Sequence, residues 1–410
     1  MEPKIRQQIR DVKQTLLTRG ADLRSAFATI ADAMRREADI ILAEQAAGRS
    51  VIPELDFADI KAGRVAESQK NQIRQRGAAI IRGVFDAAQA ADWNDELGHY
   101  IANNDYDKKQ EQKAGLDQYF SQLASGRPQI FGIYWSKPQV LARQAPSMAA
   151  AKRFLNRLWH VDGPDGDAFD PDFDYAYADR VRRRQPGDTT LGLSPHMDAG
   201  SYERWVDPAF QKIYGPVFAG HWQDYDPWQA AHRTETVEYP SPAVCSAFRT
   251  FQGWTALTPQ GAGDGTLRLV PIAKGIGYML LRALQDDVAD DDLCGAEAGR
   301  ALCADNQWHP DLLASLVSLP EVAPGDTVWW HPDIIHAVED EHRGSGYSNV
   351  IYIGASPKCH KNRVYVEKQA KAFLSGRSAP DFAAEDYEVD FAGRATSADL
   401  TELGRAQMGL

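Results

Sequence analysis

The sequence has few cysteines, and no two of them are spaced as a pair. Cys245, Cys294, Cys303 and Cys359 lie scattered along 410 residues and form no C-x-x-C motif. Disulfide frameworks and zinc knuckles both depend on close, repeated spacings. The pattern therefore predicts reduced thiols in a protein of the cytoplasm.

The sequence also lacks long apolar runs and an excess of positive charge. No stretch of about 18 apolar residues occurs, and residues 1–22 are charged throughout, so we expect neither a membrane span nor a signal peptide. Lys and Arg number 45 against 57 Asp and Glu, a net charge of −12. This balance argues against nucleic acid or an anionic membrane as partner. We expect a small-molecule substrate, and the sequence leaves a homo-oligomer open.

The chain divides into two regions with different sequence patterns. Apolar side chains recur at helical spacing near the N-terminus, so we expect helix over 3–47 with a break at Gly20. A strand is expected over 77–85, a helix capped by Asp86 follows it, and Ser147 is expected to cap another helix. From residue 180 onward, short β-like runs alternate with Gly- and Pro-containing turns, at 180–184, 189–196, 243–257, 265–272, 327–330 and 347–354.

These patterns predict a mainly β core with helical extensions. Many short strands separated by Gly and Pro are typical of a β-sandwich or barrel. The Asp-, Gly- and Pro-rich residues 162–179 are expected to form a loop, and the chain beyond residue 362 one helix and a polar tail. We divide the chain into an N-terminal helical arm (1–50), an α/β segment that packs on the core (51–179), the catalytic core with helical inserts (180–357), and a C-terminal helix and tail (358–410).

The motif His-x-Asp occurs three times, and its context differs each time. Side chains at i and i+2 of a strand point to one face, so such a pair can reach one metal ion. His160 follows a predicted helix and is better explained as a helix C-terminal histidine. His331 is followed by a proline, which bends the strand. His196 and Asp198 follow an apolar run and precede a small-residue turn, which makes them the preferred pair.

A third ligand is expected on a distant strand. Pro324-Gly325-Asp326 is a tight turn that leads into an apolar strand, and His336 follows between Ile335 and Ala337. Two histidines and one carboxylate form the facial triad that favours non-haem iron(II). We prefer His336 to His331 as the distal ligand. The alternative is that His331 and His336 are both histidines at the edge of the core, satisfied by carboxylates such as Asp333 and Glu339.

The order strand, His-x-Asp, Pro-Gly-Asp, strand, His resembles the iron(II)/2-oxoglutarate-dependent dioxygenases. Residues 77–85 with the following helix resemble the phytanoyl-CoA-hydroxylase-like members, as do 251–257 and 265–271. Taken whole, including 248–254 and 348–354, the chain resembles the YbiU-like family of this superfamily. The resemblance implies a double-stranded β-helix (jelly roll, cupin-like) core wrapped by α-helices.

The same resemblance implies an activity. Fe(II) would be held by His196, Asp198 and His336, and 2-oxoglutarate and O2 would be consumed as a small-molecule substrate is hydroxylated, with release of succinate and CO2. Related halogenases replace the carboxylate with a small residue, so Asp198 favours hydroxylation. Two alternatives stay open: a cupin-like metalloenzyme that does not use 2-oxoglutarate, and a non-catalytic metal-dependent binding protein.

The family's usual cation for the far carboxylate of 2-oxoglutarate is missing. Family members place an arginine on the strand after the distal histidine, where this chain reads Ser348-Asn349-Val350-Ile351-Tyr352. Arg249 lies inside an apolar run, where a guanidinium is costly to bury unless it is paired, for instance with a carboxylate. We prefer Arg249 to Arg343, and Arg268 comes third. Trp254 and Ser348 are further expected contacts of the cosubstrate.

The run Arg180, Arg182, Arg183 and Arg184 has two interpretations. It could attract an acidic substrate. Charge runs are more often solvated faces, and that is the simpler interpretation.

Overall fold

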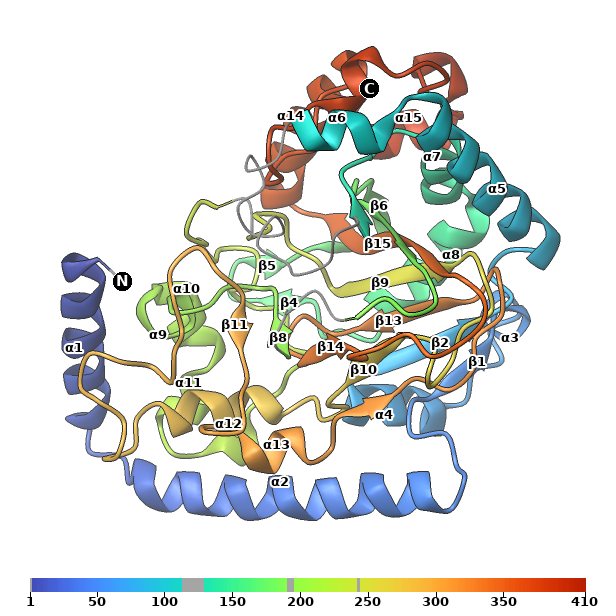
Figure 1. The fold of residues 1–410 in the computed structure, drawn as a ribbon. Helices are drawn as coiled ribbons and strands as arrows, with labels where there is room; N and C mark the ends of the chain where they lie inside the picture. The colour runs from blue at the N-terminus through green and yellow to red at the C-terminus, as the bar shows by residue number, and fades with distance from the viewer. Residues whose placement is uncertain (1, 113–128, 190–194, 242–243) are drawn as a thin grey trace.

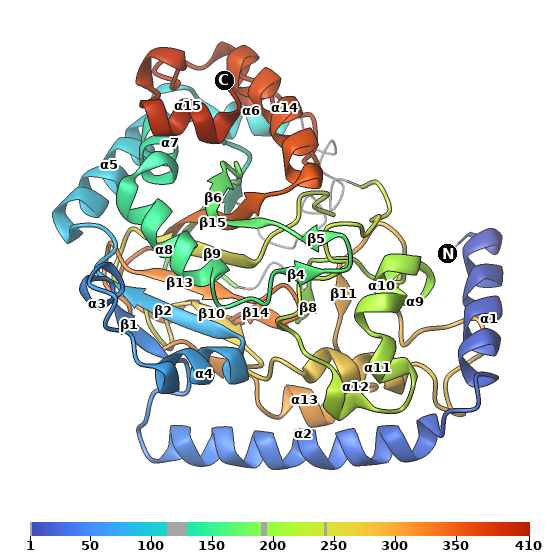
Figure 2. The same cartoon turned by 180° about the vertical axis from the view of Figure 1, so that it is seen from behind.

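The structure is a computed structural model that describes residues 2–112, 129–189, 195–241 and 244–410. Two β-sheets lie at its centre, with helices on both sides (Figures 1 and 2). The described residues form fifteen α-helices and no closed barrel, so the fold is mixed α/β rather than mainly β as expected.

The larger sheet has eight strands, and the smaller has five. The larger runs β1-β2-β13-β9-β15-β7-β3, and β6 also pairs with β15; the smaller runs β11-β8-β14-β10-β12. The strands of the larger sheet are β1 (Glu54–Asp56), β2 (Ala78–Arg82), β3 (Ile130–Phe131), β6 (Asp170–Tyr175), β7 (Val181–Arg184), β9 (Phe251–Ala256), β13 (Thr327–Trp330) and β15 (Ser348–Lys358). The strands of the smaller sheet are β8 (His196–Met197), β10 (Leu267–Leu269), β11 (Leu302–Cys303), β12 (Val317–Ser318) and β14 (His336–Val338).

An apolar core joins the facing sides of the two sheets. Ile80, Trp254 and Val328 project from the larger sheet and pack with Leu267 and Leu269 of the smaller one. Alternate residues of a strand face opposite sides, so the intervening residues of the same strands pack outward. The interior between the sheets is therefore the place where inward-facing polar side chains can gather.

Helices cover the outer face of each sheet. Outward residues of the larger sheet, such as Trp329 and Ile351, pack against α5 (Ala87–Asn103), α7 (Lys137–Gln144) and α8 (Pro146–Asn156). On the other side, Met197 of β8 joins a core with α1 (Pro3–Leu17), α2 (Leu23–Ala46) and α12 (Gly275–Arg282). In Figure 1, α2 runs along the lower edge beneath α12 and α13 (Pro310–Leu313). The remaining helices of this side are α9 (Glu203–Val206), α10 (Pro208–Ile213) and α11 (Gly215–Phe218).

The C-terminal region is folded, which corrects the expected polar tail. After α14 (His360–Ser375) the chain forms short 3-10 turns and a second helix, α15 (Glu402–Met408), beside α6 (Tyr106–Gln112) and α7 (Figure 2). Tyr387 and Phe391 are buried there. The buried Glu388 carboxylate accepts hydrogen bonds from the backbone N–H groups of Tyr134 and Trp135, at 2.5 and 3.0 Å. The tail contributes isolated contacts rather than a periodic apolar face, so no helical or strand pattern announced it.

Several local expectations were confirmed, and others were wrong. The N-terminal helices, β2, and the helix capped by Asp86 lie as predicted. Ser147 does not cap a helix, because α8 begins at Pro146 with Ala145 as its N-cap. Residues 162–179 contain short strands as well as loop, and most of the expected strand over 189–196 lies outside the described residues.

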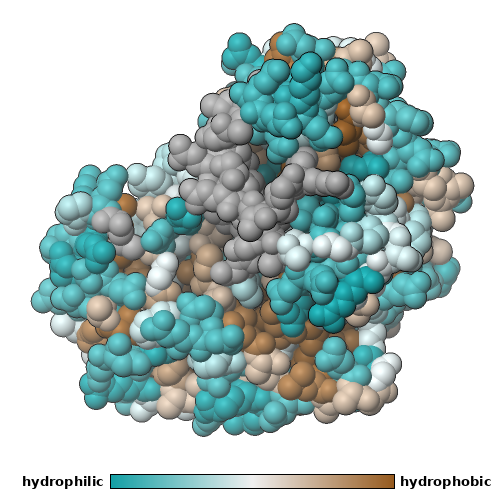
Figure 3. All heavy atoms as spheres, in the orientation of Figure 1, coloured by the Kyte–Doolittle hydropathy of each residue, from teal (hydrophilic) through white to brown (hydrophobic). Residues whose placement is uncertain are grey.

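Two expectations drawn from the composition concern the cysteines and membrane-spanning helices. All four cysteines are free thiols. Within the described part of the chain, no helix is both long and apolar enough to span a bilayer, and the face drawn in Figure 3 is mostly hydrophilic.

Candidate metal centre

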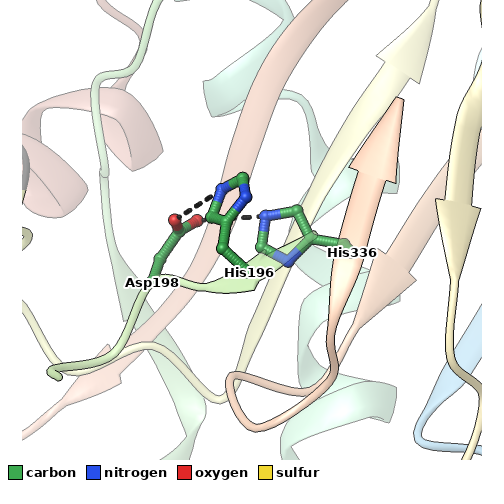
Figure 4. Close-up of side chains that lie close together, drawn as sticks. All are labelled: His196, Asp198 and His336. Atoms are coloured by element: carbon green, nitrogen blue, oxygen red, sulfur yellow. Dashed lines mark ion pairs between the residues drawn. The ribbon is translucent and has the colours of Figure 1, made fainter. Parts of the chain in front are cut away.

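His196, Asp198 and His336 come together between the two sheets. Each offers one ligand atom, and the three atoms all lie within 4.8 Å of one another. The Nε2 atoms of His196 and His336 lie 3.3 and 3.4 Å from the two carboxylate oxygens of Asp198 (Figure 4). Two imidazoles and one carboxylate converging in this way can hold one divalent transition-metal ion.

The backbone explains the convergence. His196 of β8 and His336 of β14 are directly paired residues of neighbouring antiparallel strands, which places their side chains on one face. Their imidazole ring centroids are 4.4 Å apart. Asp198 follows β8 by one residue, and its carboxylate turns back toward both rings (Figure 4). A neighbouring pair of short strands thus supplies all three groups.

Hydrogen bonds orient the ligand side chains. Gln252 of β9 donates from Nε2 to an oxygen of Asp198 at 2.9 Å, and Trp330 Nε1 donates to Gln252 Oε1 at 2.8 Å. The Nδ1 atom of His336 lies 3.2 Å from the carbonyl oxygen of Ile334. With the proton on Nδ1, that N–H donates a hydrogen bond to the Ile334 carbonyl, and Nε2 keeps its lone pair for a metal.

The protonation states also suit a metal. Burial alone raises the pKa of a carboxyl group, but His336 and His196 together hold the pKa of Asp198 well below its usual range. Burial lowers the pKa of His336, which favours the neutral imidazole. An ionised carboxylate beside a neutral histidine is the state in which these groups bind a metal ion.

A pocket with a volume of about 150 Å³ opens onto the three ligands. Its wall combines the three candidate ligands with residues of β3, β7, β9, β10, β13, β14 and β15 and with segments before β7, before β9 and after α14. Four arginines and two further aspartates belong to the wall: Arg180, Arg182, Arg184, Arg249, Asp179 and Asp381.

The arginines predicted to bind 2-oxoglutarate lie in different surroundings. Arg249 is buried in the pocket wall, and its guanidinium carbon lies 5.0 Å from the centre of the Tyr177 ring. Arg343 lies outside the pocket, where its side chain is 77% exposed and pairs with Glu341. Arg268 donates to the Leu316 carbonyl and does not line the pocket. Arg249 is therefore the only one of the three that the described pocket contains.

Of the other two residues expected to contact 2-oxoglutarate, one lines the pocket and one does not. Trp254 lines the pocket. Ser348 is buried behind the wall, where its hydroxyl donates to Gln260 at 2.7 Å and accepts from Arg182 at 3.2 Å. Ser348 therefore reaches the pocket only through Arg182.

Sequence reasoning did not place several polar residues in the wall, among them Gln252, Arg182 and Arg184. Of the two interpretations of the basic run 180–184, a site for an acidic substrate and a solvated face, the simpler solvated face is wrong for two of its members, because Arg182 is 3% exposed and Arg184 is fully buried. Period-2 spacing within a strand was the available signal, because Arg182 and Arg184 share one face of β7 while Arg183 points away. Gln252 carried no signal, since one glutamine in an apolar strand identifies no site.

The two other His-x-Asp motifs have structural partners. His331 is fully buried, stacks on Trp159 at 4.8 Å, and its Nε2 lies 3.0 Å from the Pro227 carbonyl. Asp333 is held by Arg204 at 2.6 Å and Arg233 at 3.0 Å. In the third motif, His160 is exposed and lies 2.8 Å from Asp226.

The protein thus has a candidate metal centre, made by two histidines and one aspartate, between two facing β-sheets. A family model described as Gig2-like matches residues 3–410, and the chain belongs to that family. The chain is 44% identical to the protein YbiU of Escherichia coli (strain K12) over 404 residues. The aligned region covers 98% of this chain and 96% of that protein.

Two solved structures of relatives have the same fold. One, from Salmonella typhimurium LT2 and provisionally named an oxidoreductase, is 40% identical with a TM-score of 0.93, and the match covers 100% of this chain and 98% of that one. The other, GlcNAc Inducible Gene 2 of Candida albicans, is 27% identical with a TM-score of 0.82, and covers 98% and 88%.

Proposed function

We propose that the protein is an iron(II)- and 2-oxoglutarate-dependent oxygenase that acts on a small molecule. The observation that carries the proposal is the convergence of His196, Asp198 and His336 at the wall of a pocket. The provisional oxidoreductase name of the Salmonella relative points in the same direction.

The donor set fits iron(II). Two histidines and one carboxylate form the facial triad of non-haem iron(II) oxygenases, whereas structural zinc sites are commonly closed by four protein ligands. Among the described residues, no fourth His, Cys, Asp or Glu joins the set. The metal would therefore keep open positions toward the pocket.

The strand order supports a double-stranded β-helix core. Along the chain, β7, β9, β13 and β15 belong to the larger sheet, and β8, β10, β12 and β14 belong to the smaller one. Each sheet interleaves strands that are distant in sequence, as β7-β15-β9-β13 and β8-β14-β10-β12. Two facing four-stranded sheets connected in this alternating way are typical of a jelly roll.

The side chains of the pocket have definable tasks. His196, Asp198 and His336 would hold the metal, and Gln252 would keep the Asp198 carboxylate oriented. Trp254 and Trp330, which line the pocket, would exclude water from the open positions of the metal. When bound, iron(II) with 2-oxoglutarate and O2 would supply an oxidative decarboxylation, to succinate and CO2, coupled to oxidation of a C–H bond in the substrate.

Two cations of the wall can serve the far carboxylate of 2-oxoglutarate. Arg249 is the one that the sequence predicted. Arg182 is the second, because it lines the pocket and takes Ser348 as a neighbour, at the start of the strand where family members carry their arginine. Either guanidinium would bind a carboxylate through two parallel hydrogen bonds.

Anaerobic binding followed by exposure to air tests the proposal. Iron(II) and 2-oxoglutarate added to the metal-free protein without oxygen should produce the visible metal-to-ligand charge-transfer band of this enzyme class. Admission of air should then yield succinate. A wild-type protein that gives neither the band nor succinate contradicts the proposed function.

Matched histidine variants locate the metal ligand. His336→Ala should abolish the band, because it removes one of three ligands. His331→Asn should keep it, because His331 lies in the Trp159 stack and not in the triad. A band that survives His336→Ala and is lost in His331→Asn would show that the distal ligand is His331.

A further inference from the structure

Arg182 and Arg184, the arginine pair, lie on one face of β7 and line the pocket. Among the described residues, neither has a carboxylate as hydrogen-bond partner. Arg182 donates from Nη2 alone, to Gln260 Oε1 at 3.1 Å and to Ser348 Oγ at 3.2 Å. No described residue accepts from its Nη1 atom, and its Nε atom is buried without an acceptor. Arg182 therefore keeps donors for a ligand of the pocket.

Arg184 is held at the same end of the pocket by backbone carbonyl groups. Its Nη1 atom donates to the carbonyl oxygens of Gly265 and Glu339, both at 2.9 Å, and its Nη2 atom donates to that of Asp188 at 3.1 Å. The Glu339 carboxylate accepts instead from the Ser318 hydroxyl and from backbone N–H groups. The contacts of Arg184 thus orient its guanidinium without neutralising it.

The charge of the arginine pair is only weakly compensated, in contrast to that of Arg249. Burial lowers the pKa of Arg182, and burial together with the charge of Arg182 lowers the pKa of Arg184 to about 10. Burial acts in the same direction at Arg249, but its neighbours, Asp198 and Asp179 among them, raise the pKa above its ordinary value. Buried cations without a counter-charge are costly, so the arginine pair marks a place where an anion binds.

Measured along β14, the arginine pair lies well away from the candidate metal ligands. His336 is the first residue of β14. The Glu339 carbonyl that Arg184 contacts belongs to the third residue after it, about 10 Å away at 3.3 Å per residue.

The strand β15 shows the same separation in the larger sheet. Gly354 pairs with Gln252, whose amide donates to Asp198. Arg182 pairs with Val350, four residues back along β15 and about 13 Å away. The arginine pair therefore lies at the end of the pocket that is remote from the metal ligands.

2-Oxoglutarate is too short to occupy both ends. A five-carbon diacid has four C–C bonds of about 1.5 Å each, so a molecule bound to the metal does not reach the arginine pair. Arg249 is the cation at the metal end, since a Cβ atom on Gly354 would be 3.1 Å from the Arg249 Cδ atom. The arginine pair is thus left for an anion other than the cosubstrate.

Apolar side chains line the pocket between the two ends. Trp254 and Tyr352 are paired residues of β9 and β15, and Tyr352 lies between the two positions of β15 compared above. On the facing sheet, Leu267 pairs with Val338, the residue before the Glu339 carbonyl that Arg184 contacts. A ligand that spans the pocket would therefore carry an apolar body between its anionic group and the metal.

We propose that Arg182 and Arg184 bind the anionic group of the substrate, a carboxylate or a phosphate ester, and that its apolar body extends along the pocket to the metal. The inference rests on the proposed oxygenase function, with the far carboxylate of 2-oxoglutarate directed toward Arg249. Spanning about 10–13 Å takes about seven to nine C–C bonds. The substrate class is thus an organic anion with an apolar body of about eight carbons or more.

The first experiment tests the anion site without iron. Octanoate, octyl phosphate and the neutral octanamide are titrated by calorimetry into metal-free wild type, Arg182→Gln, Arg184→Gln and Arg183→Gln. Wild type should bind at least one of the two anions about tenfold or more tightly than octanamide, and the tighter anion identifies the group. Arg182→Gln and Arg184→Gln should each lose about tenfold. Arg183→Gln is the matched control, because Arg183 lies between them on β7 and donates to the Asn94 carbonyl.

The second experiment tests the direction of the substrate. Straight-chain acids from butanoate to decanoate are added to the iron(II) protein with 2-oxoglutarate in air, and succinate is measured. Stimulation should begin at about eight carbons, because shorter acids bound at the arginine pair do not reach the metal. The affinity for 2-oxoglutarate, measured by the charge-transfer band, should fall more in Arg249→Gln than in Arg182→Gln.

The outcomes separate this inference from the proposed function. A wild-type protein without the band or succinate refutes the oxygenase function, whereas the calorimetry does not depend on iron. Octanamide that binds as tightly as both anions, or unchanged anion binding in Arg182→Gln and Arg184→Gln, overturns the anion site. A larger loss of 2-oxoglutarate affinity in Arg182→Gln than in Arg249→Gln shows that the arginine pair binds the cosubstrate and overturns the proposal.

Lysine variants replace a glutamine variant that does not fold. Arg182→Lys and Arg184→Lys keep the positive charge of the buried site, but a point charge cannot make the paired hydrogen bonds of a guanidinium. They should fold and still bind the tighter anion more weakly than wild type. Wild-type affinity in both lysine variants contradicts recognition by the two guanidinium groups.

Discussion

Gln252 Nε2 donates a hydrogen bond to Asp198 Oδ2 at 2.9 Å, and this bond links the larger sheet to the candidate metal ligands beside the smaller one. The glutamine is itself fixed by Trp330, whose indole N–H donates to Gln252 Oε1. Its amide can therefore present only the N–H side to the carboxylate.

Replacing this glutamine should weaken metal binding. Partners that orient metal ligands are worth about 10–100-fold in metal affinity, so we expect a loss of that size in Gln252→Leu, measured by competition with a chelating dye. Arg343→Gln, on the exposed turn, is the control. Unchanged affinity in Gln252→Leu would mean that Asp198 is held by the metal alone.

Asp333 should matter for stability and not for the metal. Its carboxylate is fully buried and accepts from Arg204, Arg233, Tyr214 and Tyr225. Burial raises the pKa of a carboxyl group, but Arg233 and Arg204 hold the pKa of Asp333 far below its usual range. Asp333→Asn leaves two buried guanidinium groups without their counter-charge.

We therefore expect Asp333→Asn to lower the free energy of unfolding by about 3–5 kcal/mol, measured by urea denaturation. The exposed Asp340→Asn should change it by less than about 0.5 kcal/mol. Loss of iron binding in folded Asp333→Asn, rather than loss of stability, would contradict the role given to this cluster.

The stability of the protein should fall in acid because of His331. Burial lowers the pKa of His331 to about 3, so the imidazole stays neutral in the folded protein. In the unfolded chain its pKa is about 6.5. Between these values the unfolded chain binds a proton that the folded protein does not, so the free energy of unfolding decreases as the pH falls.

The contribution of His331 is about 2 kcal/mol between pH 6.5 and pH 5, from about 1.4 kcal/mol per pH unit. Urea denaturation of wild type and His331→Asn across this range measures it, and the variant should have the shallower pH dependence. His160→Asn, at an exposed histidine, is the control. Equal slopes in wild type and His331→Asn would refute the prediction.

The helix α2 should contribute to the stability of the protein through one of its faces only. Ile41 is fully buried, while its neighbour Ile40 is 47% exposed. Ile41→Ala should lower the free energy of unfolding by about 2–5 kcal/mol, because it leaves a cavity, and Ile40→Ala should change it little. If both variants were equally destabilised, α2 would have a partner on its exposed face that the single chain does not show.

The sequence contained enough to predict the candidate metal ligands but not the whole pocket. His196 and Asp198 stood out because a strand spacing of two places both on one face, and His336 because it follows an apolar strand. The pocket arginines were harder to identify. Arg182 and Arg184 look solvated in a basic run, and only the pairing of β7 with β15 turns them inward.

The fold was predictable where strands are apolar and alternate, as at β13, and not where contacts are irregular. Pairing partners are set by long-range packing, so the neighbours of β9 could not be read from its residues. The C-terminal region is held by single buried groups such as Glu388 and by small side chains such as Ala379 and Ala395, and neither makes a periodic pattern.

Because His196 pairs directly with His336, a metal ion held by both side chains would bind only when β8 and β14 are correctly aligned. A slip of one residue would turn Met197 toward the pocket in place of His196 and break the ligand set. Because a long chain segment separates the two strands in sequence, we expect their pairing to form late in folding. A bound ion would therefore stabilise only the correctly aligned sheet. In the metal-free protein, the backbone amide hydrogens of β8 and β14 should exchange with solvent faster than those of the rest of the core.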